Sequence, residues 1–344
     1  MPTITIVGGG VAGLALAATL DPADFDVTLI ERNPGFGRVP TAFGIWPFAL
    51  AALERIGLDG EVRRAGLPLT SGVISAGSTH RPVTMTSRSP GLWLLPRPSL
   101  LRVLDEAVPV GVVRERREVD DPTALDGDLV VAADGVRSVV RRRIWGDEPR
   151  DTGVVAVRGV LPTAPDGPQD RICEFWGDGA LFGVGPNRLP EGIGTNWYAS
   201  ARRREESPEA SLSWAREAFA DFPEPVRATL GGADPMRTVV NTILESRHPR
   251  RLVRDRYVLV GDAAHAMSPN LGRGACEAMV DAITLGLALN EHGRDGLRRY
   301  ERSRLRPGQR MRAASALARR IALSDRAGRV VVGAVGALGR HLPR

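Results

Sequence analysis

The chain contains no lysine, and all 46 of its basic residues are arginines. This absence excludes Schiff-base catalysis, attachment of pyridoxal phosphate and a P-loop lysine. Cysteine is nearly absent too: Cys173 and Cys276 form no motif, so we predict no metal site and expect a reducing cytoplasm. No apolar run reaches the ~18 residues that span a bilayer. The first strand begins so close to Met1 that we also expect no signal or transit peptide.

The 46 basic residues slightly outnumber the 40 acidic residues, which gives the chain a formal net charge of +6. A basic chain can bind nucleic acid when its charges gather on one element. Here the arginines are scattered in twos and threes, as at 141–143, 202–204 and 319–320. We therefore expect solvated helix faces and an affinity for an anionic dinucleotide, and no nucleic-acid partner.

A glycine-rich turn follows the first apolar strand. Over residues 4–30 the order strand, glycine turn, helix and strand leads to Glu31, which is the dinucleotide-binding fingerprint in its required context. Gly8 permits the tight turn, Gly10 lets a pyrophosphate approach the backbone, and Gly13 lets helix and strand pack closely. The Glu31 carboxylate would accept ribose hydroxyls and repel a 2′-phosphate, so this site favours FAD or NAD over NADP. The candidate residues here are Gly8, Gly10, Ala12, Gly13, Glu31, Arg32 and Arg38.

A later apolar strand ends in Gly261-Asp262, and a Pro/Gly-rich turn over 269–274 leads into a long helical stretch. A helix start preceded by glycines offers free backbone N–H groups and the positive end of the helix dipole. This arrangement suits the N1–C2=O edge of a reduced flavin. Asp262 is placed to accept hydrogen bonds from a polyol such as the ribityl chain. We assign His265, inside this turn, a structural hydrogen bond rather than a proton shuttle.

Two further segments lie between these sites. Residues 128–138 form an apolar strand that ends in Asp134-Gly135 and continues into an Arg-rich helical segment. Taken alone, Asp134 would be interpreted as a helix cap. Arg97 opens a helical segment in the pattern Arg-x-x-Leu, and its planar guanidinium suits phosphate oxygens.

Together these segments resemble the single-component (class A) flavoprotein monooxygenases, the p-hydroxybenzoate hydroxylase-like family. The resemblance implies that Arg97 reaches the phosphate or ribityl region of FAD. It also implies that the Asp134 motif lies between FAD and a transient nicotinamide site. Family members often have a neutral residue where this chain has Arg273, whose side chain we expect to point outward. The flavin-side candidates are Asp134, Gly261, Asp262, Pro269, Leu271, Gly272, Arg273, Gly274 and Ala275, with Pro269 packing on the ring.

The resemblance also implies a reaction. One FAD is reduced by NADH or NADPH, reacts with O2 to a C4a-hydroperoxyflavin and transfers one oxygen atom to a hydrophobic, ring-containing small molecule. No catalytic base for a phenol stands out among Tyr198, Tyr257 and Tyr300. Base-assisted hydroxylation is therefore not supported, while epoxidation and Baeyer–Villiger insertion stay open.

Two alternatives remain. The first is a geranylgeranyl reductase-like flavin C=C reductase, which His265 and the following Pro269 disfavour. The second is a catalytically inactive flavin-fold protein that binds and sequesters a small aromatic molecule. The missing lysine excludes flavin-dependent halogenation. The identity of the substrate and the oligomeric state are left open.

The predicted fold is α/β: a Rossmann-like FAD-binding domain with an inserted antiparallel-sheet substrate domain and C-terminal helices. The FAD-binding domain is expected at 1–67, 92–150 and 246–325. The substrate domain is expected at 68–91 and 151–245, and a tail at 326–344.

Inside the substrate domain we expect short strands at 154–160, 171–176, 180–185 and 193–199, and a covering helix at 208–222. The C-terminal helical region is expected to break near Pro307. By family position, the residues expected to line the substrate cavity are Trp46, Phe175, Trp176 and Phe182.

Overall fold

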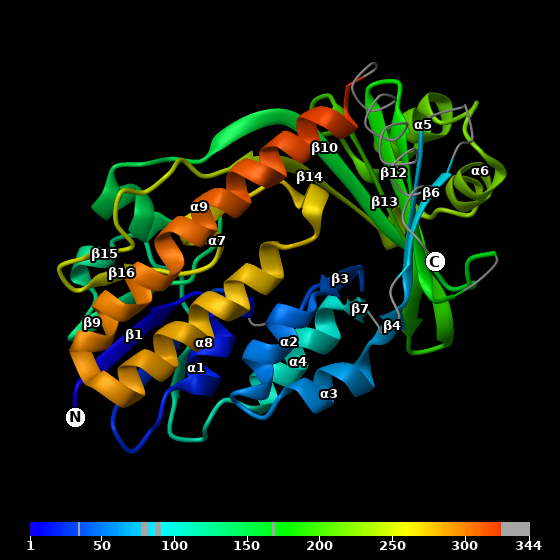
Figure 1. Ribbon diagram of the computed structural model, residues 1–344. Helices are drawn as coiled ribbons and strands as arrows, with labels where there is room; N and C mark the ends of the chain where they lie inside the picture. Colours follow the sequence, from blue (N-terminus) through cyan, green and yellow to red (C-terminus); the bar gives the residue numbers. More distant parts are fainter. Residues whose placement is uncertain (34, 77–81, 87–90, 167–168, 325–344) are drawn as a thin grey trace, which may run out of the picture.

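The computed structural model describes residues 1–33, 35–76, 82–86, 91–166 and 169–324. These residues form three β-sheets (Figure 1), and the predicted tail at 326–344 lies outside them. Within the described part of the chain, no helix is both long and apolar enough to cross a membrane.

The central strands of the first sheet are short, mostly apolar and buried, as expected for a parallel sheet covered on both faces, whereas its edge strands carry charged residues. Its order is β15-β16-β9-β1-β2-β8, and all pairs are parallel except β15 with β16. The strands are β1 (Thr3–Val7), β2 (Asp26–Ile30), β8 (Val113–Glu115), β9 (Leu129–Ala132), β15 (Val253–Arg254) and β16 (Tyr257–Leu259).

One short helix from the N-terminal part of the chain and two long helices from its C-terminal part lie beside this sheet (Figure 1). They are α1 (Val11–Thr19), α8 (Gly274–His292) and α9 (Gly296–Ala322). Helix α1 packs on α8 and α8 packs on α9. A smaller sheet of β3 (Ala42–Ile45), β7 (Leu92–Pro96) and β4 (Leu67–Leu69) lies next to α2 (Pro47–Glu54), α3 (Asp59–Ala65) and α4 (Arg97–Glu106). Short helical turns complete the chain at Pro122–Ala124, Arg141–Trp145, Pro235–Arg237, Asp262–His265 (α7), Pro269–Leu271 and Gly293–Asp295.

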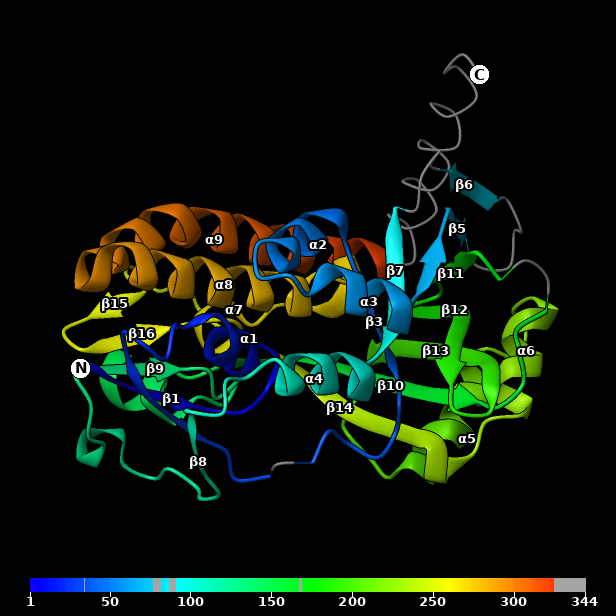
Figure 2. The same cartoon turned by 90° about the horizontal axis from the view of Figure 1, so that it is seen from below.

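The second large sheet has seven strands in the order β14-β10-β13-β12-β11-β5-β6. It lies beside the parallel sheet and not within it (Figure 2). Its strands are β5 (Ser71–Ala76), β6 (Pro82–Thr86), β10 (Arg150–Leu161), β11 (Arg171–Gly177), β12 (Ala180–Leu189), β13 (Gly192–Arg202) and β14 (Thr238–Glu245).

The four predicted strands of this sheet are confirmed, although each is longer than expected. The sheet is not wholly antiparallel, because β5 runs parallel to β11. Strand β14 was not predicted. The expected covering helix at 208–222 is present as α5 (Pro208–Ala218), which ends four residues earlier. A further helix, α6 (Glu224–Gly231), was not predicted and begins directly after Pro223.

The two faces of the seven-stranded sheet have different partners. One face carries Phe182 and Trp197, which form an apolar cluster with Phe219 at the end of α5. The opposite face turns toward the parallel-sheet side: Asn196 Oδ1 accepts from the backbone N–H of Ala42 at 2.8 Å, and Asn187 Nδ2 donates to a carbonyl in the same loop. The predicted domain boundaries remain a proposal, which this separation of sheets supports.

Two sequence expectations were wrong. Helix α9 continues through Pro307, which is exposed, so that the carbonyl it leaves unpaired lies on the solvent side. Arg141 and Arg319 do not lie on solvated helix faces. Their relative exposures are 2% and 3%, because their guanidinium groups bond to backbone carbonyls or to a buried carboxylate.

Candidate active site

The predicted glycine turn lies between β1 and the N-terminus of α1. Gly8 adopts φ +105°, and a side chain there would come within 2.4 Å of the Ala133 carbonyl oxygen. A Cβ on Gly13 would lie 1.8 Å from the Gly8 oxygen, whereas one on Gly10 would meet nothing within 4 Å. No side chain caps α1. The first backbone amides of this helix therefore face open space, which fits a pyrophosphate.

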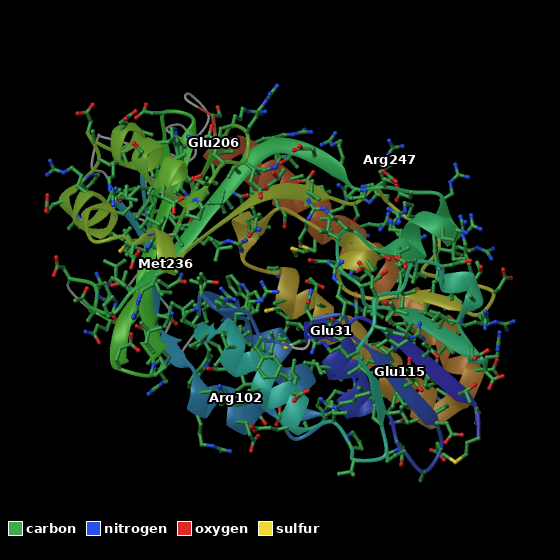
Figure 3. All side chains as sticks on the ribbon, turned by 180° about the vertical axis from the view of Figure 1, so that it is seen from behind. Glu31, Arg102, Glu115, Glu206, Met236 and Arg247 are labelled. Atoms are coloured by element: carbon green, nitrogen blue, oxygen red, sulfur yellow. The ribbon has the colours of Figure 1, made fainter. Side chains whose placement is uncertain are left out.

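Glu31 follows β2 directly. Its carboxylate accepts the Gly9 N–H at 2.7 Å and the Asn33 N–H at 2.6 Å, so it lies beside the glycine turn. Figure 3 shows Glu31 toward the middle of the molecule. Of the two neighbouring arginines predicted for this site, Arg32 pairs with Glu118 on the surface and Arg38 is exposed. The structure does not bring either of them onto the turn.

The second predicted motif surrounds the start of α8. Asp262 is exposed to solvent, yet enough protein surrounds it that burial raises the pKa of its carboxyl, against the lowering charges of His265 and Arg97. Its Oδ1 atom would be 4.0 Å from a Cβ placed on Gly274. Helix α8 begins there without a side-chain cap. Asp262, Arg97 and the free amides of α8 thus belong to one neighbourhood.

His265 belongs to a buried network, which supports the structural role predicted for it. Its Nε2 contacts Asp281, which also accepts the Gly261 N–H at 2.9 Å and Arg304 Nε at 2.6 Å. Burial alone would lower the pKa of His265, but the Asp281 carboxylate outweighs it and the pKa is raised. Burial would raise the pKa of Asp281, but His265 and Arg304 lower it. The imidazole is therefore engaged in holding α8 and α9 to the turn after β16.

The loop before α8 differs from the expectation in one respect. Arg273 does not point outward: its guanidinium lies 3.9 Å from the centre of the Phe48 ring and bonds Glu277 at 3.0 Å. Pro269 is exposed, as a residue that packs on a ligand ring would be. The indole Nε1 of Trp46 lies 3.8 Å from the Cβ position of Gly272 and has no hydrogen-bond partner among the described residues. Trp46 is therefore beside the expected flavin edge.

Asp134 lies at the end of β9, next to the glycine turn. It accepts the Val140 N–H at 3.3 Å, its Oδ1 has no partner among the described residues, and burial raises its pKa. Arg141, in the following turn, donates to the carbonyls of Ala263 and Ala264 at 2.8 Å each. The two Asp-containing motifs are thereby joined through backbone carbonyls.

The predicted substrate residues do not lie together. Phe175 and Phe182 belong to the apolar cluster under α5 and α6, on the face away from the parallel sheet. Trp176 lies on the other face, where its Nε1 donates to Glu174 at 2.9 Å. The sequence does not identify Tyr198 as a neighbour of this tryptophan, because only the strand register brings Tyr198 to Glu174. The sequence does alternate Asn196 and Tyr198 with the buried apolar residues Trp197 and Ala199. This alternation could have indicated that Asn196 and Tyr198 share one face of the strand.

Comparisons with known proteins agree with this geometry. The family model described as an FAD binding domain matches residues 105–315, and an NAD(P)-binding Rossmann-like domain matches residues 6–42. The aurachin C monooxygenase/isomerase of Stigmatella aurantiaca is 32% identical over 314 residues, which are 84% of this chain and 80% of that protein. The chain belongs to the class A FAD-dependent monooxygenases.

Two more comparisons fit the same family. The 2-heptyl-3-hydroxy-4(1H)-quinolone synthase of Pseudomonas aeruginosa is 34% identical over 312 residues, which cover 82% of this chain and 79% of that enzyme. Among solved structures, Klebsiella pneumoniae HpxO complexed with FAD and uric acid has a TM-score of 0.83 at 21% identity, covering 98% of this chain and 93% of that one. This monooxygenase therefore shares its fold with a flavin-bound structure, and its cofactor is FAD with NAD(P)H as reductant.

Proposed function

We propose that this monooxygenase transfers one oxygen atom of O2 to a small aromatic or heteroaromatic ring that carries an ionisable hydroxyl or ring N–H. The observation that carries the proposal is the polar row Glu174, Tyr198 and Arg158 on the sheet face turned toward the FAD-binding side. A purely hydrophobic substrate would have no use for half-buried charged groups there. The quinolone named in one relative is a ring of the proposed kind.

FAD, when bound, supplies electron transfer and oxygen activation. The residues of the chain hold and orient it. The amides at the start of α1 and Glu31 suit the pyrophosphate and adenosine ribose, and Asp262 suits the polyol. The free amides of α8 suit the electron-rich edge of the ring, where a preformed positive dipole stabilises negative charge. Two free thiols fit a reducing cytoplasm, which we propose as its location.

Turnover with a compound panel tests the proposal. The purified FAD-loaded protein is mixed with NADH or NADPH and with hydroxylated benzoates, hydroxypyridines and 4-quinolones. We expect one ring type to stimulate nicotinamide oxidation and to gain one oxygen atom that originates from isotopically labelled O2. A product reduced at a C=C bond, without oxygen, would identify a reductase instead. Tight binding of a ring compound with no stimulated oxidation would identify a sequestering protein.

A further inference from the structure

A cavity of about 490 Å³ opens beside the C-terminal half of α9. One wall is the segment 245–248, which starts at the end of β14, and Arg150 at the start of β10 lies next to it. The opposite wall is α9, where Arg312, Ala316 and Arg320 follow one another at intervals of four residues and therefore share one helix face. The volume is typical of small-molecule sites, which occupy roughly 300–1,000 Å³.

The cavity lies outside the FAD site. Figure 3 shows Arg247, one of its lining residues, at the periphery of the molecule, whereas Glu31 lies toward the middle. The buried Glu245 separates the cavity from the loop before α8. Its Oε1 accepts from the hydroxyl of Ser268 at 2.5 Å, and Ser268 directly precedes Pro269. A ligand in this cavity would therefore bind in addition to FAD and not in its place.

The cavity contains more cations than anions. Glu245 is the one carboxylate among its described lining residues, and its Oε1 already lies 3.3 Å from Nη2 of the buried Arg319. The arginines that line the cavity are Arg150, Arg247, Arg312 and Arg320. Nη2 of Arg150 lies 3.6 Å from the second oxygen of Glu245, and Nε of Arg247 lies 3.8 Å from Asp147. The two α9 arginines form no ion pair with any described residue.

Arg312 gives the clearest indication that an anion belongs in the cavity. Its Nη2 donates to His248 Nε2, so the imidazole accepts and is neutral in this contact. The Nε of Arg312 is buried and has no partner among the residues that the structure describes. Burial lowers the pKa of Arg312, and Arg150 lowers it further although Glu245 opposes the change. Burial and the charge of Arg312 likewise lower the pKa of His248. An oxygen atom of a ligand would satisfy the free guanidinium N–H and relieve this repulsion.

The other arginines of α9 provide a comparison. Arg302, Arg306 and Arg310 are exposed and lie outside the cavity, so water solvates their N–H groups. The lining arginines, in contrast, come from β10, from the loop after β14 and from α9, and these three segments direct their cations at one space. A solvated basic helix face requires no such convergence.

The residues of the lining favour a phosphate group. A guanidinium donates paired N–H groups that match phosphate oxygens, and several guanidinium groups around one centre suit a group with three terminal oxygens better than a carboxylate with two. Beside these cations, Ala313, Ala316 and the exposed Leu317 form an apolar strip on α9. Cations next to an apolar strip fit a phosphate ester, whose phosphate and organic part would contact one each.

We propose that the cavity between α9 and the end of β14 is a second ligand site, distinct from the FAD site, and that it binds a phosphate ester. Arg312 supplies a buried N–H donor, and Arg150, Arg247 and Arg320 supply further donors around the phosphate. Two sources share this chemistry: a soluble phosphate ester and the phosphate headgroup of a lipid. The site does not depend on the oxygen transfer proposed above.

Isothermal titration calorimetry of the FAD-loaded protein with inorganic pyrophosphate tests the site. Bound FAD keeps the probe away from the glycine turn. We expect one pyrophosphate to bind per chain, and we expect the affinity to fall as the salt concentration rises. Acetate, an anion with two oxygens and one charge, is the matched probe and should bind at least about tenfold more weakly.

Three variants separate a specific site from a general attraction. Arg312→Gln and Arg320→Gln should each weaken pyrophosphate binding about tenfold or more, because each removes a charge-assisted hydrogen bond. Arg310→Gln is the matched control, since it makes the same change of charge on the same helix outside the cavity, and it should change the affinity less than about twofold. The visible FAD spectrum shows that each variant is folded. If Arg312→Gln does not retain FAD, the exposed Arg320 provides the test.

Two further measurements distinguish the sources. The protein is sedimented with phosphatidylcholine vesicles that do or do not contain phosphatidic acid. Sedimentation that needs phosphatidic acid, is lost in Arg312→Gln and is kept in Arg310→Gln would assign the site to a lipid headgroup. Displacement of pyrophosphate by glycerol 3-phosphate or NADP⁺, without sedimentation, would assign it to a soluble phosphate ester.

Absence of pyrophosphate binding to the FAD-loaded protein at low salt would overturn the proposal. Equal weakening in Arg310→Gln and Arg312→Gln would overturn it as well, because the attraction would then come from the net charge of the chain. Neither result involves turnover. A failure to oxygenate any ring compound therefore refutes only the proposed function, and a failure to bind pyrophosphate refutes only the second site.

Discussion

Replacing Asp281 by asparagine should destabilise the protein by about 4 kcal/mol, because breaking a buried ion pair costs roughly 3–5 kcal/mol. Asp281 is fully buried and accepts from Gly261, His265 and Arg304. The variant keeps the shape of the side chain but leaves Glu277 as the one counter-charge of the Arg304 guanidinium among the described residues. Because Asp281 has zero exposure, bulk solvent does not compensate the lost charge.

The pH dependence of this loss has a definite sign. The pKa of His265 is raised in the folded protein. Its contribution to the free energy of unfolding is therefore complete below pH 6.5, the ordinary pKa of histidine, and is lost as the pH rises through the pKa of the folded state. The pKa of Asp281 is lowered in the folded protein. Its contribution to the free energy of unfolding is therefore complete above pH 3.8, the ordinary pKa of aspartate, and is lost as the pH falls through the pKa of the folded state. The difference in the free energy of unfolding between the wild type and Asp281→Asn should be largest between pH 3.8 and pH 6.5. It should become smaller at alkaline pH.

Urea unfolding of the FAD-loaded proteins, followed by tryptophan fluorescence at about pH 6 and about pH 9, measures both effects. Glu118→Gln is the control, because it removes a solvent-exposed ion pair worth at most about 1 kcal/mol. A loss below about 1 kcal/mol for Asp281→Asn at the lower pH would refute the assignment of this network as the support of the turn after β16. If the free energy of unfolding of the wild type and that of Asp281→Asn differ more at the higher pH than at the lower one, the predicted direction of the His265 contribution is refuted.

Three further outcomes are expected. Gly13→Ala should abolish FAD retention on gel filtration, because a methyl group would lie 1.8 Å from the oxygen of the first glycine of the turn. Gly183→Ala should keep the FAD spectrum but lower the free energy of unfolding by about 1–3 kcal/mol, because its methyl group would lie 2.1 Å from Cζ of Tyr198 and displace the ring; a urea midpoint equal to that of the wild type would contradict the ring position. Burial raises the pKa of Cys276 to about 12, so mass spectrometry after iodoacetamide treatment near neutral pH should find the half-buried Cys173 modified first.

Local patterns predicted the cofactor side of the fold well. The turn around Gly8 and the start of α8 are each contained in about twenty consecutive residues, so their chemistry can be read along the chain. The substrate side could not be read in this way. Phe175 and Phe182 were assigned to the wrong face because a strand shows its alternation but not which face meets the cofactor.

Other errors also came from tertiary context. Tyr198 is twenty-four positions from Glu174 in the sequence, and only the pairing of both strands with β12 brings them together. Arg141 was expected in solvent because a run of arginines usually lies there, yet distant carbonyls bury it. The helical region was expected to break near Pro307, but the exposed position of this residue lets α9 continue.

The order of strands in the parallel sheet has a consequence for how the protein is made. Strand β1 pairs on one side with β2 and on the other with β9, and β9 then needs β16, which ends at Leu259. The first and last strands of the FAD-binding sheet are thus separated by more than two hundred residues along the chain, all of which must be synthesised before the sheet is complete. Such distant strand pairings form slowly, and the edge of β1 that pairs with β9 remains exposed until β9 has been synthesised. We expect FAD to join only a nearly complete chain, so that stalled translation products would depend on chaperones rather than on the cofactor.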